Sequence, residues 1–155
     1  MIDRRTLLKA AGTAVVATKL GTAAAWAEPD DPLSYATVDE LIAMFQARKA
    51  SPVDLLKAQI KRIEAFNSKV NCITYEHFDQ ALKEAQQSEE RYRRGDARPL
   101  EGITVAIKDE FGRPGWRVTQ GSLVYKDSAL ATENAAIIDM LEAAGAVMPF
   151  QTKVL

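Results

Sequence analysis

The sequence predicts an α/β fold, and two observations carry that prediction. Residues 37–94 contain three segments with helix start or stop signals, and apolar residues recur at helical spacing in the first two. Residues 103–150 then follow the order strand, loop, helix and strand, which is typical of a parallel α/β sheet.

Two capping motifs set the starts of the first helices. Thr37-Val38-Asp39-Glu40 forms a capping box, in which each of the two end residues satisfies a backbone amide of the other, so a helix should run to about Lys49. Ser51 is the next N-cap, with Pro52 at the first helical position, where a missing N–H is tolerated. This second helix is expected to end near Asn67.

The middle of the chain alternates between strand and helix signals. Val70–Tyr75 is a short β-prone run, and Glu76–Arg94 is expected to be a third helix, closed by Gly95. Ile103–Ile107 is a nearly continuous apolar, β-branched run, which predicts a strand that is buried on both faces of a sheet.

The last two elements are predicted from residue 133 onward. A helix is expected over Glu133–Ala144, closed by Gly145, and Ala146–Phe150 is expected to be a strand. The residues predicted to face inward on this helix are Ile137, Leu141 and Ala144.

The composition indicates one globular domain without a broad electrostatic partner. The 155 residues are 47% hydrophobic and 26% charged, and their formal net charge of −1 gives no general attraction for nucleic acid. A nucleotide-binding fold is disfavoured because neither glycine-rich phosphate motif occurs in the sequence.

Residues 1–27 resemble a twin-arginine signal peptide. Arg4 and Arg5 precede a mildly apolar run, Lys19 interrupts that run before it could span a bilayer, and Ala25-Trp26-Ala27 fits a signal-peptidase site. We therefore expect recognition by the twin-arginine export machinery of a bacterium or archaeon, cleavage near Ala27, a periplasmic or secreted product and no stable membrane anchor. The alternative is an alanine-rich amphipathic helix that belongs to the fold.

This interpretation divides the chain into three parts. Residues 1–27 are the signal peptide, residues 28–36 a turn-rich linker, and residues 37–155 the folded domain. Cys72 and His77 are the only residues of their types, so no internal disulfide or Cys/His metal cluster is expected. Cys72 is expected to be a small buried residue, and His77 a surface or capping residue.

Lys108 is the main candidate for a catalytic residue. It ends the predicted strand Ile103–Ile107, where a lysine either extends to water or lies among polar groups that turn it into a base. A neutral lysine can accept a proton from a hydroxyl group. Asp109, which follows it, could equally form a simple ion pair with it.

Four blocks of the sequence resemble the amidase-signature family, in the family's order and spacing, and the resemblance covers residues 37–153. The blocks are Arg62–Asn67 with its extension to Asn71, Pro99–Asp109, Thr119–Ser122 and Leu141–Val147. The resemblance implies N-terminal helices followed by the first strands and helix of that family's mixed sheet, which would be incomplete here.

The resemblance also implies a chemistry. Lys108 matches the lysine of a Ser–cis-Ser–Lys triad, in which a bridging serine relays the proton of a nucleophilic serine toward the lysine. Members of the family hydrolyse small carboxamides without a metal or an organic cofactor.

The sequence also departs from the family pattern. Both serines are expected beyond the block that resembles Gln151–Lys153, so we expect these residues alone to be an inactive N-terminal portion of an amidase. Ser122 and Ser128 are not assigned as nucleophiles, and Glu110 replaces a frequent asparagine. The alternative is a short exported binding protein on a partial amidase scaffold, and an unpaired sheet edge could favour self-association.

Overall fold

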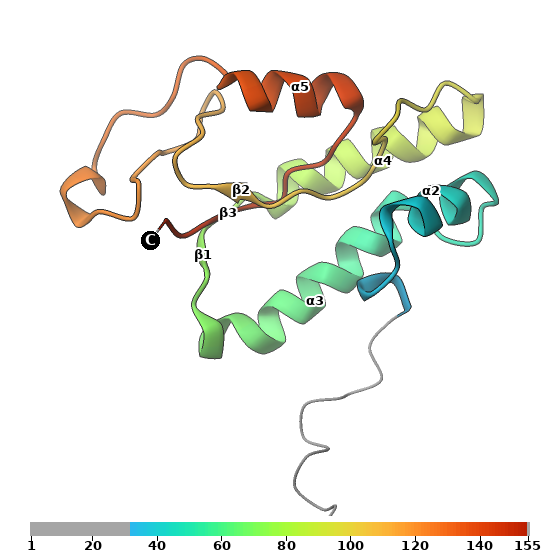
Figure 1. The fold of residues 1–155 in the computed structure, drawn as a ribbon, viewed down its shortest axis with the longest axis horizontal. Helices are drawn as coiled ribbons and strands as arrows, with labels where there is room; N and C mark the ends of the chain where they lie inside the picture. The colour runs from blue at the N-terminus through green and yellow to red at the C-terminus, as the bar shows by residue number, and fades with distance from the viewer. Residues whose placement is uncertain (1–31, 155) are drawn as a thin grey trace, which may run out of the picture. The chain divides into compact units, whose positions relative to one another are not determined.

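The computed structural model describes residues 32–154, which form a mixed α/β unit (Figure 1). Its elements in chain order are η2 (Pro32–Ser34), α2 (Val38–Gln46), α3 (Pro52–Val70), β1 (Ile73–Glu76), α4 (Phe78–Arg94), β2 (Ile107–Lys108), η3 (Leu123–Tyr125), α5 (Ala136–Ala144) and β3 (Phe150–Thr152). The predicted signal peptide and residues 28–31 of the predicted linker lie outside the described residues.

Both predicted capping motifs are confirmed. The Glu40 side chain accepts from the Thr37 amide at 2.8 Å, and the Thr37 hydroxyl accepts from the Glu40 amide at 3.3 Å. Ser51 and Asp54 form the same reciprocal pair at the start of α3. That helix runs three residues beyond the predicted Asn67, because Asn71 takes the left-handed conformation that ends it.

The sheet has the order β1-β3-β2, with β3 in the centre. β2 pairs with β3 in parallel, whereas β1 pairs with β3 antiparallel. The parallel pairing suggested by the strand-loop-helix-strand order is confirmed for β2 and β3, and the antiparallel β1 makes the sheet mixed, as the family resemblance implies. The parallel pair follows from the crossover through α5, and β1 joins β3 from the other side.

The strand predicted over Ile103–Ile107 is much shorter than expected. Only Ile107–Lys108 forms β2, and an isolated parallel bridge joins Thr104 to Val147. Ile103 and Ile107 are buried, but Ala106 is exposed. The prediction of burial on both faces is wrong, because Val105 and Ile107 pack with α5 whereas Thr104 and Ala106 line an open pocket beside α3.

Helices cover both sides of β2 and β3 (Figure 1). On one side α5 packs on the sheet through a cluster of Ile107, Trp116, Ile138 and Met148. On the other side α3 and α4 contact the sheet through Leu56, Ala81, Ala85 and Val147. A third cluster of Leu41, Phe45, Leu55 and Ile103 joins α2 to α3.

Two smaller predictions are corrected. Ile138, and not Ile137, is the buried isoleucine of α5, because this helix begins at Ala136 rather than Glu133 and its inward face is set by the sheet. Cys72 is exposed rather than buried, since it lies in the turn between α3 and β1. No helix within residues 32–154 is long and apolar enough to cross a membrane.

Candidate functional site at the end of strand β2

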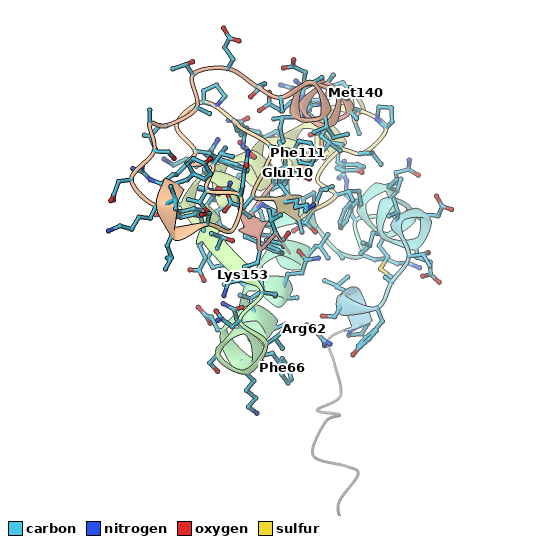
Figure 2. All side chains as sticks on the ribbon, turned by 60° about the vertical axis from the view of Figure 1, so that its left-hand side comes forward. Arg62, Phe66, Glu110, Phe111, Met140 and Lys153 are labelled. Atoms are coloured by element: carbon cyan, nitrogen blue, oxygen red, sulfur yellow. The ribbon has the colours of Figure 1, made fainter. Side chains whose placement is uncertain are left out.

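Lys108 is the last residue of β2, and its side chain extends toward solvent. The side chain is 47% exposed, and its Nζ lies 3.1 Å from Oε1 of Glu110. The ion pair considered for Asp109 is therefore made by Glu110 instead. Glu110 and its neighbour Phe111 follow the strand directly (Figure 2), and their backbone amides both donate to the Lys108 carbonyl oxygen.

Asp109 points in the opposite direction, into the protein. Its carboxylate is fully buried and accepts hydrogen bonds from neutral donors. Oδ1 accepts from the Thr119 amide at 2.9 Å and from Nε2 of Gln151 at 3.3 Å, and Oδ2 accepts from the Thr119 hydroxyl. The Asp109 amide also donates to the Thr152 carbonyl at 2.9 Å. These bonds tie the end of β2 to the loop after it and to β3.

Gln151 connects this carboxylate to a histidine. The Gln151 side chain is fully buried, and its Nε2 also donates to the Arg117 carbonyl oxygen at 3.0 Å. Its Oε1 lies 2.9 Å from Nε2 of His77. Because Nε2 of Gln151 faces two acceptors, Oε1 is the acceptor for His77, and Nε2 of His77 must carry the hydrogen.

His77 occupies the N-cap position of α4, in agreement with the predicted capping role, but its side chain is half-buried rather than on the surface. It precedes α4 without making a side-chain cap bond, and its ring stacks on Trp116 with 4.0 Å between centroids. Burial is the main cause that lowers the pKa of His77, and Arg113 lowers it further, while Gln151 and Glu84 act in the other direction. The lowered pKa of His77 favours the neutral form of the ring.

Trp116 and Arg113 form a second group that the sequence did not reveal. Trp116 is only 2% exposed, although it lies in a loop rich in glycine and proline. Arg113 donates to Glu84 of α4 at 2.7 Å and to Glu142 of α5 at 2.8 Å, and its guanidinium lies 5.5 Å from the Trp116 ring centroid. The arginine within this loop was the one feature of the sequence that could have indicated the group. Its two partners could not be identified, because each lies 29 residues away, one on either side of Arg113 in the sequence.

The nearby serines have local roles. The Ser122 hydroxyl accepts from the Val124 amide at 3.2 Å and so caps η3. The Ser128 hydroxyl donates to the Val118 carbonyl at 3.1 Å.

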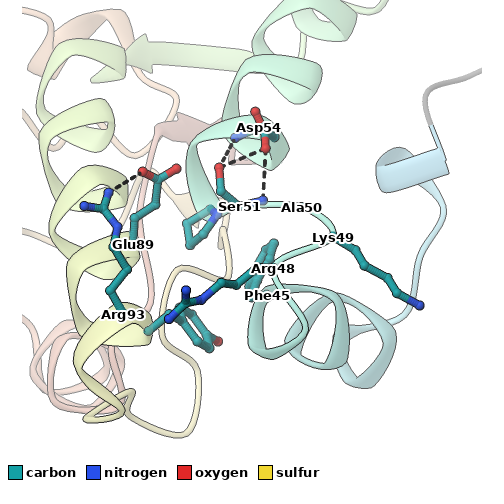
Figure 3. Close-up of a pocket in the computed structure, with 10 residues that line it drawn as sticks. Phe45, Arg48, Lys49, Ala50, Ser51, Asp54, Glu89 and Arg93 are labelled. Atoms are coloured by element: carbon teal, nitrogen blue, oxygen red, sulfur yellow. Dashed lines mark hydrogen bonds and ion pairs between the residues drawn. The ribbon is translucent and has the colours of Figure 1, made fainter.

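A pocket of about 360 Å³ lies elsewhere, between the α2–α3 turn and α4 (Figure 3). Ser51 and Asp54 are bonded to each other there, and Arg93 pairs with Glu89 (Figure 3). The lining residues come from segments remote in sequence from β2, and these charged groups have partners within the protein. Within residues 32–154, no group of three or more His, Cys, Asp or Glu side chains is arranged to hold a metal ion.

Comparisons with a family model and with known proteins agree on one family. Residues 54–154 match the family model described as Amidase. One subunit of the glutamyl-tRNA(Gln) amidotransferase of Methylobacillus flagellatus is 35% identical over 111 residues, which are 72% of this chain and 22% of that protein.

Solved structures resemble the same part of the chain. The peptide amidase of Stenotrophomonas maltophilia is 27% identical, with a TM-score of 0.71 over 78% of this chain and 25% of that one. A bacterial aryl acylamidase of the amidase signature family shares the fold, with a TM-score of 0.73 at 23% identity, over 79% of this chain and 26% of that one. The chain thus spans about a quarter of the length of the relatives it matches.

Proposed function

The chain belongs to the amidase family, and from this premise we propose that it is the N-terminal part of a hydrolase that cleaves carbon–nitrogen bonds of small carboxamides. The match covers residues 54–154, which include β2, the buried network behind it and β3. Since the matched segment is only about a quarter of the length of each relative, the complete activity requires residues that this segment does not contain.

Lys108 is the proposed general base. The observation that carries this role is its place at the carboxyl end of β2, with Asp109 anchored inward and the amine directed to an uncovered face. Ligands of open α/β sheets commonly bind outside the carboxyl ends of the strands. A lysine in this place can take up a proton from a hydroxyl group brought to it.

The Lys108–Glu110 ion pair adds a requirement to the mechanism. A nearby carboxylate stabilises the protonated amine, whereas a base must be neutral to accept a proton. The proposed role therefore requires that the Lys108–Glu110 pair be separated in the complete enzyme. The bridging and nucleophilic serines come from the remaining polypeptide, so residues 1–155 alone hydrolyse no amide.

Export is a separate proposal that the sequence motif supports. Arg4 and Arg5 direct the chain to the twin-arginine machinery, and the signal is removed near Ala27. Fusing residues 1–40 to a reporter that folds in the cytoplasm should place the reporter outside the cytoplasmic membrane. Replacing both arginines by lysine should retain it inside, and export of that variant would exclude this route.

A chimeric enzyme tests the proposed function. Residues 54–154 would replace the matching segment of the Stenotrophomonas maltophilia peptide amidase, and hydrolysis of that enzyme's own amide substrate would be measured. We expect measurable turnover from the chimera and none from the 155-residue chain. A folded chimera without turnover, or hydrolysis by the chain alone, would contradict the proposal.

A further inference from the structure

Strand β2 is too short to determine by itself which way Lys108 points. It contains only Ile107 and Lys108, and successive side chains of a strand point to opposite faces. Ile107 and Asp109 are buried, whereas Lys108 and Glu110 are exposed. A slip of one residue would turn Lys108 into the core and Asp109 out of it, so another feature must fix the register.

The buried carboxylate of Asp109 is the anchor. A charge without compensation is costly in the interior, and the bonds to Asp109 come from an amide, a hydroxyl and a carboxamide. Each of these donors is therefore needed to keep the carboxylate inside. Two of them belong to Thr119, in the loop, and the third belongs to Gln151, in β3.

Gln151 has the only orientation in which all its bonds are made. Its register partner in the sheet is Ile107, so its side chain enters the protein on the same face as Asp109. If its amide group rotated by half a turn, oxygen would face Asp109 Oδ1 and the Arg117 carbonyl, and nitrogen would face the His77 N–H. The two acceptors, Asp109 Oδ1 and the Arg117 carbonyl oxygen, therefore set the nitrogen of the Gln151 amide toward Asp109, and His77, held flat against Trp116, binds the amide oxygen.

We propose that Gln151 is a positioning residue for Lys108. Its amide holds Asp109 inward, and Asp109 holds the adjoining Lys108 on the uncovered face where the reacting hydroxyl must arrive. His77 contributes a third bond, to the amide oxygen, which holds the Gln151 side chain in place. This inference rests on the proposed function, because the position of Lys108 matters to a reaction only if Lys108 is the base.

Amide hydrogen exchange of the 155-residue chain, followed by NMR, tests the anchor. Gln151→Met keeps the size of the side chain and removes its hydrogen bonds, while Gln86→Met makes the same change at an exposed position of α4. We expect at least tenfold faster exchange of the Asp109, Thr119 and Gln120 amides in Gln151→Met, with amides of α3 and α4 unchanged, and no change in Gln86→Met.

His77→Phe provides an independent variant, since it keeps an aromatic ring against Trp116 and removes only the bond to Gln151. The same amides should exchange faster, to a smaller extent. Equal exchange in Gln151→Met and the wild-type chain, or uniform acceleration over the whole chain, would overturn the inference.

The chimeric enzyme distinguishes positioning from a purely structural role. Gln151→Met in the chimera should lower kcat at least tenfold, leave KM within twofold and leave thermal unfolding close to that of the parent. An active chimera whose kcat is unaffected by Gln151→Met overturns the positioning role alone. A folded but inactive parent chimera overturns the proposed function and the positioning role with it, whatever the exchange data show.

Discussion

Glu101 is a fully buried carboxylate whose charge is balanced mainly by Arg98, with Arg91 Nε at 3.8 Å as a second, more distant partner. Arg98 donates to it through Nε at 2.6 Å and Nη2 at 3.0 Å, and the Ser88 hydroxyl donates at 2.6 Å. Arg98 also donates to the Glu142 carbonyl oxygen in the last turn of α5. A single carboxylate thus joins α4, the turn before Ile103 and the end of α5.

The charge of Glu101 makes the stability depend on pH. Burial by itself raises the pKa of Glu101, but the bonds from Arg98 and Ser88 outweigh it, and the pKa lies below its ordinary value of 4.5. A lowered folded-state pKa contributes stability that is complete above the unfolded-state pKa and is lost as the pH falls below it.

Glu101→Gln should therefore destabilise the protein at pH 7 and much less in acid. We expect a loss of about 2 kcal/mol at pH 7, less than for fully buried pairs because Arg98 is partly hydrated. Urea unfolding of both proteins at a series of pH values from 7 to 3 checks this. A difference that stays constant below pH 4.5 would contradict the assigned role of the charge.

The contacts of individual site residues were harder to predict from the sequence than the helices were. Lys108 could be singled out because a lysine ends an apolar run, but the inward anchor of Asp109 depends on Thr119 and Gln151. Gln151 lies 42 residues from Asp109 and 74 residues from His77. No local pattern encodes such contacts, so the sequence predicted the position of His77 at the start of α4 but not its stacking on Trp116.

At the scale of elements, two helices end in the same way but in different surroundings. α4 ends at Gly95 and α5 ends at Gly145, both with a positive φ. A Cβ at Gly95 would meet nothing within 4 Å, whereas a Cβ at Gly145 would lie 2.8 Å from Glu101 Oε2 and 2.9 Å from Arg98 Nε. The cap of α5 therefore also makes room for the buried ion pair.

These two glycines give a matched pair of substitutions. Gly95→Ala should cost about 1 kcal/mol, the penalty for a side chain in the left-handed conformation. Gly145→Ala should cost about 3 kcal/mol, because crowding of the ion pair adds to the same backbone penalty. Urea unfolding of both variants provides the measurement, and equal losses would show that Gly145 serves only as a helix cap.

Helix starts were the most predictable elements, because a capping box is complete within four residues. The strands were less predictable, because each exists only through pairing with a distant segment. β2 contains only Ile107–Lys108, because its partner β3 contains only Phe150–Thr152. The residues that precede the two strands pair only through the isolated Thr104–Val147 bridge.

At the scale of the whole molecule, the described residues combine a packed interior with exposed apolar side chains. Ala106 is exposed just before β2, and Val70 is exposed at the end of α3. Tyr35, which precedes α2, is also exposed, and its hydroxyl accepts a hydrogen bond from Arg62 of α3. Arg62 lies over the Tyr35 and Phe66 rings, next to Phe66 on α3 (Figure 2). This exposure, together with the length of the relatives, supports the view that the segment works as part of a larger domain.

The central claim is that Lys108 supplies the base of an amidase site, and one comparison in the chimeric enzyme tests it most directly. Turnover would be measured for Lys108→Ala beside Lys83→Ala, which removes an exposed lysine from α4. Lys108→Ala should lower kcat by about 10³-fold, within the usual range for loss of a general base, and should leave thermal unfolding unchanged because its side chain is 47% exposed. Lys83→Ala should retain full activity. Near-normal turnover of a folded Lys108→Ala chimera would contradict the claim.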